Sequence, residues 1–149
     1  MNKIKLRQYR ALVREQQLLE KKIQRYKDRI NNLPDVYDKV QASSAEFPYV
    51  PIHIPVKAKD PEAAAELNNL IRMNEQRQQD IIKALAEIEE YIKHIPDSED
   101  RLIFEMVYLQ GKTYRETGDE LHLAFSTIGK RISDQLARDE SFDKSHKSK

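Results

Sequence analysis

The stretch FEMVYLQGKTYRETGDELHLAFSTIGKRISDQL, residues 104–136, decides the fold of this chain, because its glycines and capping residues divide it into short helices. It contains all three glycines of the sequence: Gly111, Gly118 and Gly129. Thr113, followed three residues later by Glu116, forms a capping box and predicts a short helix over residues 114–121. Gly111 is suited to end the preceding helix in the left-handed conformation, and Gly118 allows the short helix to approach its neighbour.

Two further helices flank the short one. Capping by Asp97 or Ser98 predicts a supporting helix through about Leu109, and another helix is expected from near Phe125 to about Ala137. The inward residues predicted for the supporting helix are Leu102, Ile103, Met106 and Leu109, and those for the last helix are Ile128, Ile132 and Leu136. A short helix, a tight turn and a second helix form the helix-turn-helix arrangement, which places its second helix in the DNA major groove. We therefore assign residues 97–140 to one such unit and 141–149 to a flexible polar tail.

Before this unit, in residues 1–96, the six prolines leave two long stretches free of proline, and we expect a long helix in each. Apolar residues recur in steps of three and four, as in a heptad pattern. The first run passes through Tyr9, Leu12, Gln16, Leu19, Ile23, Tyr26, Ile30 and Leu33. The second passes through Leu67, Leu70, Asn74, Arg77, Ile81, Ala84, Ile88, Tyr91 and Ile95, widened by Ile71, Ile82, Leu85 and Ile92. Asp60 is the expected N-cap of the second helix and Pro61 its first residue.

The connection between the long helices, residues 34–60, is rich in proline. Its alternation from Val50 to Val56 is compatible with a short edge strand, but Pro51 and Pro55 remove hydrogen-bond donors and favour an extended loop. We expect an ordered loop whose apolar residues pack on the helices: Phe47, Tyr49, Val50, Ile52, Ile54 and Val56. The predicted fold is therefore all-α, with a long helical hairpin or coiled-coil body joined to the C-terminal unit. Pairing of the helices within one chain and a homodimer through the long helices both remain open, beside a monomer.

Charge is unevenly distributed along the chain. Residues 1–33 carry ten basic and three acidic side chains, whereas residues 97–140 carry six and ten, although the net charge of the whole chain is only +1. The acidity of the C-terminal unit opposes DNA binding, because phosphate neutralisation supplies much of the affinity. Either the basic first helix joins a DNA surface, or it faces the carboxylates of the second long helix and water.

The C-terminal stretch resembles region four of bacterial sigma factors. The matching positions are Tyr108, Leu109, Gly111, Tyr114, Glu116, Gly118, Leu121 and Ile128. The layout of a basic helical N-terminus, the segment SSAEFPYVPIHIPV and this terminal unit resembles small phage and prophage transcriptional regulators of the RinA and ArpU types. The sequence departs from the region-four pattern at Ala124, Thr117 and His122, where a capping residue, an apolar residue and Gly are usual.

The arrangement and the resemblance together imply a sequence-specific transcription regulator that binds double-stranded DNA. Phe125 is suited to contact a thymine methyl group, Ser126 a base edge, and Lys130 guanine or phosphate, with Thr127 on the flank of the same helix. Expected phosphate contacts are Thr113, Arg115 and Arg131. The alternatives are a small terminase-like subunit for DNA packaging, an adaptor that binds RNA polymerase, or a unit of this shape that contacts protein.

Other classes of function find little support in the sequence. There is no Cys, the four histidines are isolated from one another, and no glycine-rich phosphate loop occurs, so we expect no catalytic residue, metal or cofactor. No apolar run approaches the roughly 18 residues needed to span a bilayer. We expect a soluble cytoplasmic protein that does not bind membranes.

Overall fold

A computed structural model describes the backbone of residues 1–43 and 51–147 and the side chains of residues 1–34 and 60–141. The chain forms two compact units. The core unit joins Met1–Gln17 to Gln79–Lys149, and the hairpin unit is Leu18–Gln78. Two long helices, α2 (Tyr9–Asn31) and α3 (Pro61–Lys93), each contribute to both units. This division does not coincide with the boundary near residue 96 that the sequence suggests.

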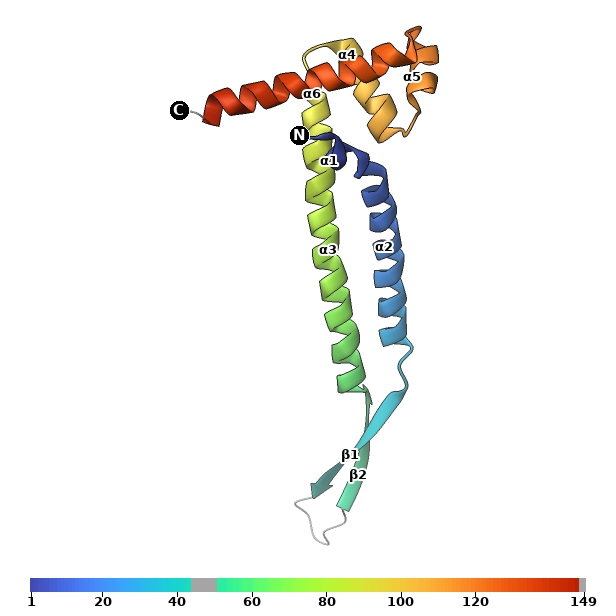
Figure 1. The fold of residues 1–149 in the computed structure, drawn as a ribbon. Helices are drawn as coiled ribbons and strands as arrows, with labels where there is room; N and C mark the ends of the chain where they lie inside the picture. Colours follow the sequence, from blue (N-terminus) through green and yellow to red (C-terminus); the bar gives the residue numbers. More distant parts are fainter. Residues whose placement is uncertain (44–50, 148–149) are drawn as a thin grey trace. The chain divides into compact units, whose positions relative to one another are not determined.

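The hairpin unit is built from the end of α2, two strands and the beginning of α3. Strand β1 (Asp35–Ser43) pairs antiparallel with β2 (Pro51–Lys59), in a register that places Asp35 opposite Lys59 and Ser43 opposite Pro51. The chain thus returns to the point where α2 ends, and α3 runs in the opposite direction to α2 (Figure 1). Leu19, Ile23 and Ile71 are the buried apolar side chains described in this unit.

The expectation of an extended loop at residues 34–60 was therefore wrong. Pro51 is the first residue of its strand, a position where a missing donor costs little, and Pro55 lies opposite Lys39. In a two-stranded sheet each strand keeps a free edge, so a proline nitrogen that faces this edge breaks no ladder hydrogen bond. Phe47, Tyr49 and Val50 lie outside the described residues, as does the predicted packing of the apolar side chains from Ile52 to Val56.

Local signals in the sequence set the limits of α3. Pro61 is its first residue, as predicted, and the Asp60 carboxylate accepts a hydrogen bond from the Glu62 amide at 3.0 Å. The apolar run predicted from Tyr9 to Leu33 is confirmed, since each of its residues is buried or half-buried. The line predicted for the second long helix is confirmed at most positions, but Leu70, Arg77 and Ile82 are exposed. The buried or half-buried line runs through Leu67, Ile71, Asn74, Gln78, Ile81, Leu85, Ile88 and Ile92.

The core unit adds five further elements to its parts of α2 and α3. They are α1 (Lys3–Arg7), α4 (Ser98–Phe104), the π-helical turn η1 (Glu105–Leu109), α5 (Tyr114–Leu121) and α6 (Phe125–Lys147). Asp97 caps α4 by accepting a hydrogen bond from the Asp100 amide at 2.9 Å. The helix α6 begins where predicted but continues ten residues beyond Ala137, so residues 141–147 are helical rather than a flexible tail.

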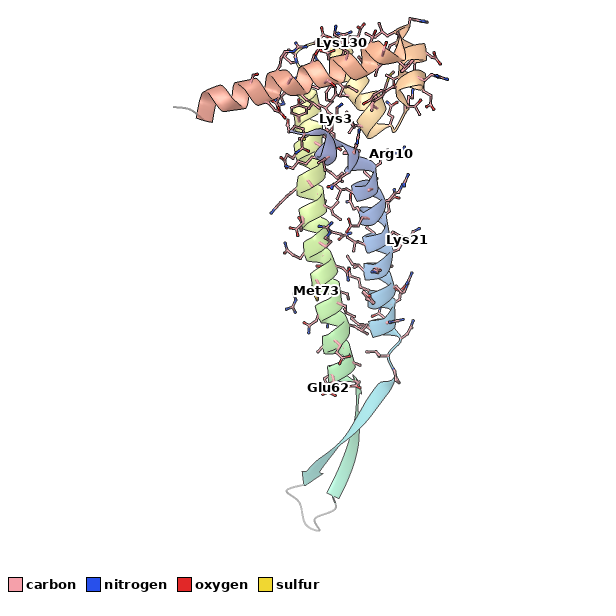
Figure 2. All side chains as sticks on the ribbon, in the orientation of Figure 1. Lys3, Arg10, Lys21, Glu62, Met73 and Lys130 are labelled. Atoms are coloured by element: carbon pink, nitrogen blue, oxygen red, sulfur yellow. The ribbon has the colours of Figure 1, made fainter. Side chains whose placement is uncertain are left out.

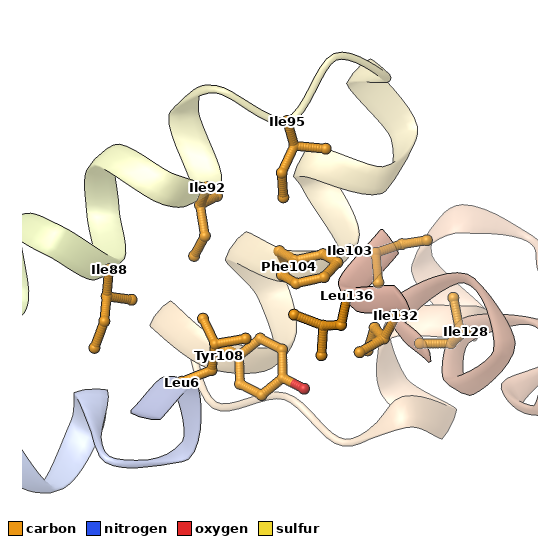
Figure 3. Packing of buried hydrophobic residues seen from close by; sticks show 10 residues of the cluster. All are labelled: Leu6, Ile88, Ile92, Ile95, Ile103, Phe104, Tyr108, Ile128, Ile132 and Leu136. Carbon is orange, nitrogen blue, oxygen red and sulfur yellow. The ribbon is translucent and has the colours of Figure 1, made fainter. Parts of the chain in front are cut away.

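The hydrophobic core of this unit draws on elements from both ends of the chain (Figure 3). Phe104 lies at its centre, fully buried, with ring centroids 6.2 Å from Tyr91 and 5.6 Å from Tyr108. The cluster comprises Leu6, Ile88, Ile92, Ile95, Ile103, Phe104, Tyr108, Ile128, Ile132 and Leu136. The inward positions predicted on α6 are confirmed, whereas Leu102 is 44% exposed and was wrongly expected inside.

The N-terminal segment is part of this core. Leu6 of α1 is fully buried, and Met1, Tyr9 and Leu12 pack against the same cluster. Polar contacts hold the segment at its edges: the N-terminal ammonium lies 3.2 Å from the Asp139 carboxylate, and Lys5 Nζ lies 2.7 Å from Glu87 Oε1. The basic N-terminus and the C-terminal helices are therefore one folded body, which the sequence pattern did not indicate.

The chain is predominantly helical, as predicted, with the β1–β2 hairpin as the described exception. In the part of the chain that the structure describes, no helix combines the length and the apolar character that crossing a bilayer requires.

Candidate nucleic-acid interface

The short helix α5 begins at the capping residue that the sequence predicts. Thr113 Oγ1 accepts a hydrogen bond from the Glu116 amide at 3.1 Å. Thr117, which stands where an apolar residue is usual, is completely buried, and its hydroxyl donates to the Thr113 carbonyl at 2.9 Å. Burial of this hydroxyl is therefore compensated within the helix, and α5 keeps its packing despite the polar residue.

The turn between α5 and α6 depends on close backbone contact. The amide of Leu123 donates to the Gly118 carbonyl at 2.8 Å, and a side chain at Gly118 would overlap the carbonyl oxygen of Leu123. His122 adopts the left-handed conformation with φ of 58°. Gly111 is also left-handed, with φ of 76°, and ends the supporting helix as predicted. These contacts set the angle at which α6 leaves the turn.

The first turns of α6 present one face to the core and another to solvent. Ile128 and Ile132 are fully buried, whereas Phe125 is 57% exposed. Ser126, Lys130 and Ser133 are also exposed, and Thr127 and Gly129 are half-buried (Figure 2 labels Lys130). No acidic residue occurs from Phe125 to Ser133. The outer face thus offers an aromatic ring, hydroxyls and an ammonium group.

Residues from neighbouring elements extend this face. The guanidinium carbon of Arg115 on α5 lies 5.9 Å from the ring centroid of Phe125, a cation–π contact. Lys3 Nζ donates to Ser133 Oγ at 3.4 Å, which brings a cation of α1 to the exposed side of α6. Thr113 and Arg115 are exposed at the start of α5. Sequence reasoning missed Lys3, since no local pattern indicates that α1 packs near α6.

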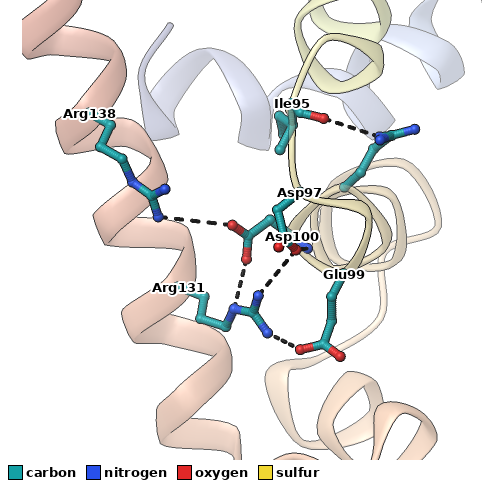
Figure 4. A network of polar contacts seen from close by, with 7 residues as sticks. Ile95, Asp97, Glu99, Asp100, Arg131 and Arg138 are labelled. Carbon is teal, nitrogen blue, oxygen red and sulfur yellow. Dashed lines mark hydrogen bonds and ion pairs between the residues drawn. The ribbon is translucent and has the colours of Figure 1, made fainter.

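Arg131, in contrast, is held on the opposite flank by three carboxylates (Figure 4). Its Nε lies 2.7 Å from Asp100 Oδ1, its Nη2 lies 3.2 Å from Asp97 Oδ1, and it also pairs with Glu99. Burial raises the pKa of Asp100, and Asp97 adds to the rise while Arg138 opposes it. Arg131, expected as a phosphate contact, is therefore paired with the carboxylates at the start of α4.

The acidity of residues 97–140 is partly compensated by such pairs. Five of the ten carboxylates of this segment form ion pairs: Asp97, Glu99 and Asp100 with Arg131, Glu120 with Lys112, and Asp139 with the N-terminus. Residues 1–17, in the same folded unit, add five basic groups and one acidic group. The net negative charge of residues 97–140, which have six basic and ten acidic side chains, is therefore offset by the net positive charge of residues 1–17.

Metal-ligating side chains do not cluster within the described residues. Comparison of the chain with protein-family models, with curated proteins and with solved structures finds no match.

Proposed function

We propose that this protein is a sequence-specific DNA-binding transcription regulator, in which α5, the turn and α6 act as a helix-turn-helix. The observation that carries the proposal is the division of α6 into two faces. Ile128 and Ile132 hold one face in the core, while Phe125, Ser126 and Lys130 project from the other. An exposed N-terminal half of an anchored second helix is the part that reads base edges in this motif.

The chemistry of the exposed residues suits the major groove. Ser126 can exchange hydrogen bonds with a base edge, Phe125 can contact a thymine methyl group, and Lys130 can donate to guanine or phosphate. Thr127 borders this face. Thr113 and Arg115, at the start of α5, are the proposed phosphate contacts that fix the register of the protein on the duplex.

The distribution of charge around α6 favours DNA binding, although residues 97–140 as a whole are acidic. The proposed reading face has no carboxylate from Phe125 to Ser133, and Arg131, on the other flank of α6, pairs with three carboxylates at the start of α4. The N-terminal segment adds cations to the same folded unit. Lys130 and Arg115 are therefore exposed cations on the proposed DNA-binding side of α5 and α6.

Selection from a pool of random-sequence duplexes tests the proposal. We expect the wild-type chain to enrich a consensus sequence, and Lys130→Ala to bind that consensus about tenfold more weakly, as expected for the loss of one good base contact. Lys83→Ala, which removes an exposed lysine from α3, is the matched control and should bind like the wild type. Enrichment of no consensus even at low salt would overturn the proposal.

Two further measurements separate the other functions that share this architecture. A solution mass equal to a ring of several subunits would indicate a DNA-packaging subunit, whereas we expect a monomer or a homodimer through the long helices. Capture of RNA polymerase by a chain that selects no DNA sequence would instead indicate a polymerase adaptor. Ile128→Asp, which places a charge in the core, should unfold the unit and serves as the negative control.

A further inference from the structure

A basic cleft of about 330 Å³ lies between the N-terminal segment and the connection from η1 to α5. It belongs entirely to the core unit. Its lining combines two arginines and two tyrosines with apolar groups: Leu6, Arg7, Arg10, Val107, Tyr108 and Tyr114. Leu6 and Tyr108 are members of the hydrophobic core, so the floor of the cleft is fixed by packing.

The two arginines place positive charge beside the start of α5. The guanidinium of Arg10 lies against Gly111, because a side chain added at Gly111 would overlap it. Gly111 is two residues before Thr113, the N-cap of α5. Arg7 and Arg10 are exposed, and neither forms an ion pair with a described residue. Their charges are therefore available to an anion.

A buried hydroxyl group completes the cleft. Tyr108 is only 5% exposed, and its hydroxyl has no hydrogen-bond partner of standard geometry among the described residues. Burial raises the pKa of Tyr108, the neighbouring Tyr114 hydroxyl raises it further, and the charge of Arg7 opposes this rise, so the hydroxyl keeps its proton at neutral pH. The cleft therefore places the phenol groups of Tyr108 and Tyr114 beside the two arginines.

We propose that this cleft binds a phosphate group of the duplex DNA backbone, with Arg7 and Arg10 as the cationic ligands. The inference rests on the proposed function and extends it, because it assigns a DNA contact to the N-terminal segment. Tyr114 of the cleft lies between Thr113 and Arg115 in sequence, so this phosphate site adjoins the phosphate contacts proposed for those two residues. Arginine suits this role because its planar guanidinium donates two parallel hydrogen bonds to a phosphate.

The salt dependence of DNA binding tests the inference. Each phosphate contact adds about 0.9 to the slope of log affinity against log salt concentration. Because the two arginines hold one phosphate, Arg7→Gln combined with Arg10→Gln should lower the slope by about 0.9, so that the affinity lost relative to the wild type grows about eightfold between 1 M and 0.1 M salt. Arg14→Gln combined with Lys83→Gln removes the same charge from exposed positions outside the cleft and should leave the slope unchanged.

The outcomes distinguish this inference from the proposed function. Failure of the wild type to bind any duplex overturns the proposed function. A wild type that binds, together with an unchanged slope for the folded Arg7/Arg10 double variant, overturns only the phosphate site. An equal decrease for both double variants also overturns it, because the effect would then reflect net charge alone. Stabilisation of the wild type by inorganic phosphate, without a change in slope, would reveal a small-anion site instead. Thermal unfolding establishes that each variant folds.

Discussion

Arg131 Nε of α6 lies 2.7 Å from Oδ1 of Asp100 on α4 and forms an ion pair with it, across a separation of 31 residues in sequence. The Asp100 side chain is almost completely buried, whereas that of Arg131 is 27% exposed. Arg138 lies 4.0 Å from the other carboxylate oxygen. This pair joins the supporting helix to the proposed reading helix, so its integrity affects the orientation of α6.

Arg131→Ala should destabilise the protein by about 3 kcal/mol, because it leaves the carboxylate of Asp100 buried without its nearest cation. Asp100→Asn in the same chain should recover much of this loss by removing the uncompensated charge. Urea unfolding measures both changes in the free energy of unfolding. If Arg131→Ala keeps its stability but loses DNA affinity, Arg131 contacts phosphate after all.

Stability at alkaline pH should depend on Tyr9. Its hydroxyl donates to Glu89 Oε1 at 2.6 Å, and burial together with Glu89 raises the pKa of Tyr9 from 10.0 to about 12. The folded state therefore favours the protonated phenol, so this contribution is complete below pH 10 and is lost as the pH rises from 10 to 12.

The measurement is the urea midpoint of the wild type and of Tyr9→Phe at a series of pH values up to 11. The phenylalanine variant lacks this titration, while every other ionisable group is common to both chains. We expect the advantage of the wild type to shrink as the pH rises above 10. A constant difference between the two proteins over this range would contradict the assigned hydrogen bond.

Gly118→Ala should destabilise the core unit by about 2 kcal/mol, because the new methyl group overlaps the backbone carbonyl of Leu123 and the turn must shift. Gly129→Ala is the matched control. A side chain there would lie 3.3 Å from the ring of half-buried Tyr114, which can move slightly, and alanine is the better helix former by about 0.5–1 kcal/mol. Thermal unfolding of both variants checks this, and equal losses would argue against the described turn.

His122→Gly should stabilise the protein by about 1 kcal/mol, because His122 holds a left-handed conformation that glycine adopts without strain. His122→Val should have the opposite effect, since a β-branched residue is strained most at positive φ. Chemical unfolding of the three proteins gives the order, and a glycine variant less stable than the wild type would show that the His122 side chain itself contributes.

Local features were predictable because short-range chemistry determines them. The caps at Asp60 and Thr113, the left-handed Gly111 and the inward line from Ile128 to Leu136 each depend on residues within about two helical turns. Which residues of α3 face inward was harder to predict from the sequence. Both Leu70 and Ile71 continue an apolar repeat, and only packing decides which of them turns inward.

By itself, the sequence determined the helical class, the start of α3 and the exposed face of α6, since proline, glycine and apolar periodicity act locally. Only the tertiary structure decided that Leu6 joins the C-terminal core, that Arg131 pairs with the start of α4, and that Arg10 reaches Gly111. These pairings bring together residues that are far apart in the chain, and their formation depends on burial and charge compensation in three dimensions. No periodic pattern in the sequence predicts them. They place the basic N-terminus beside the proposed DNA surface.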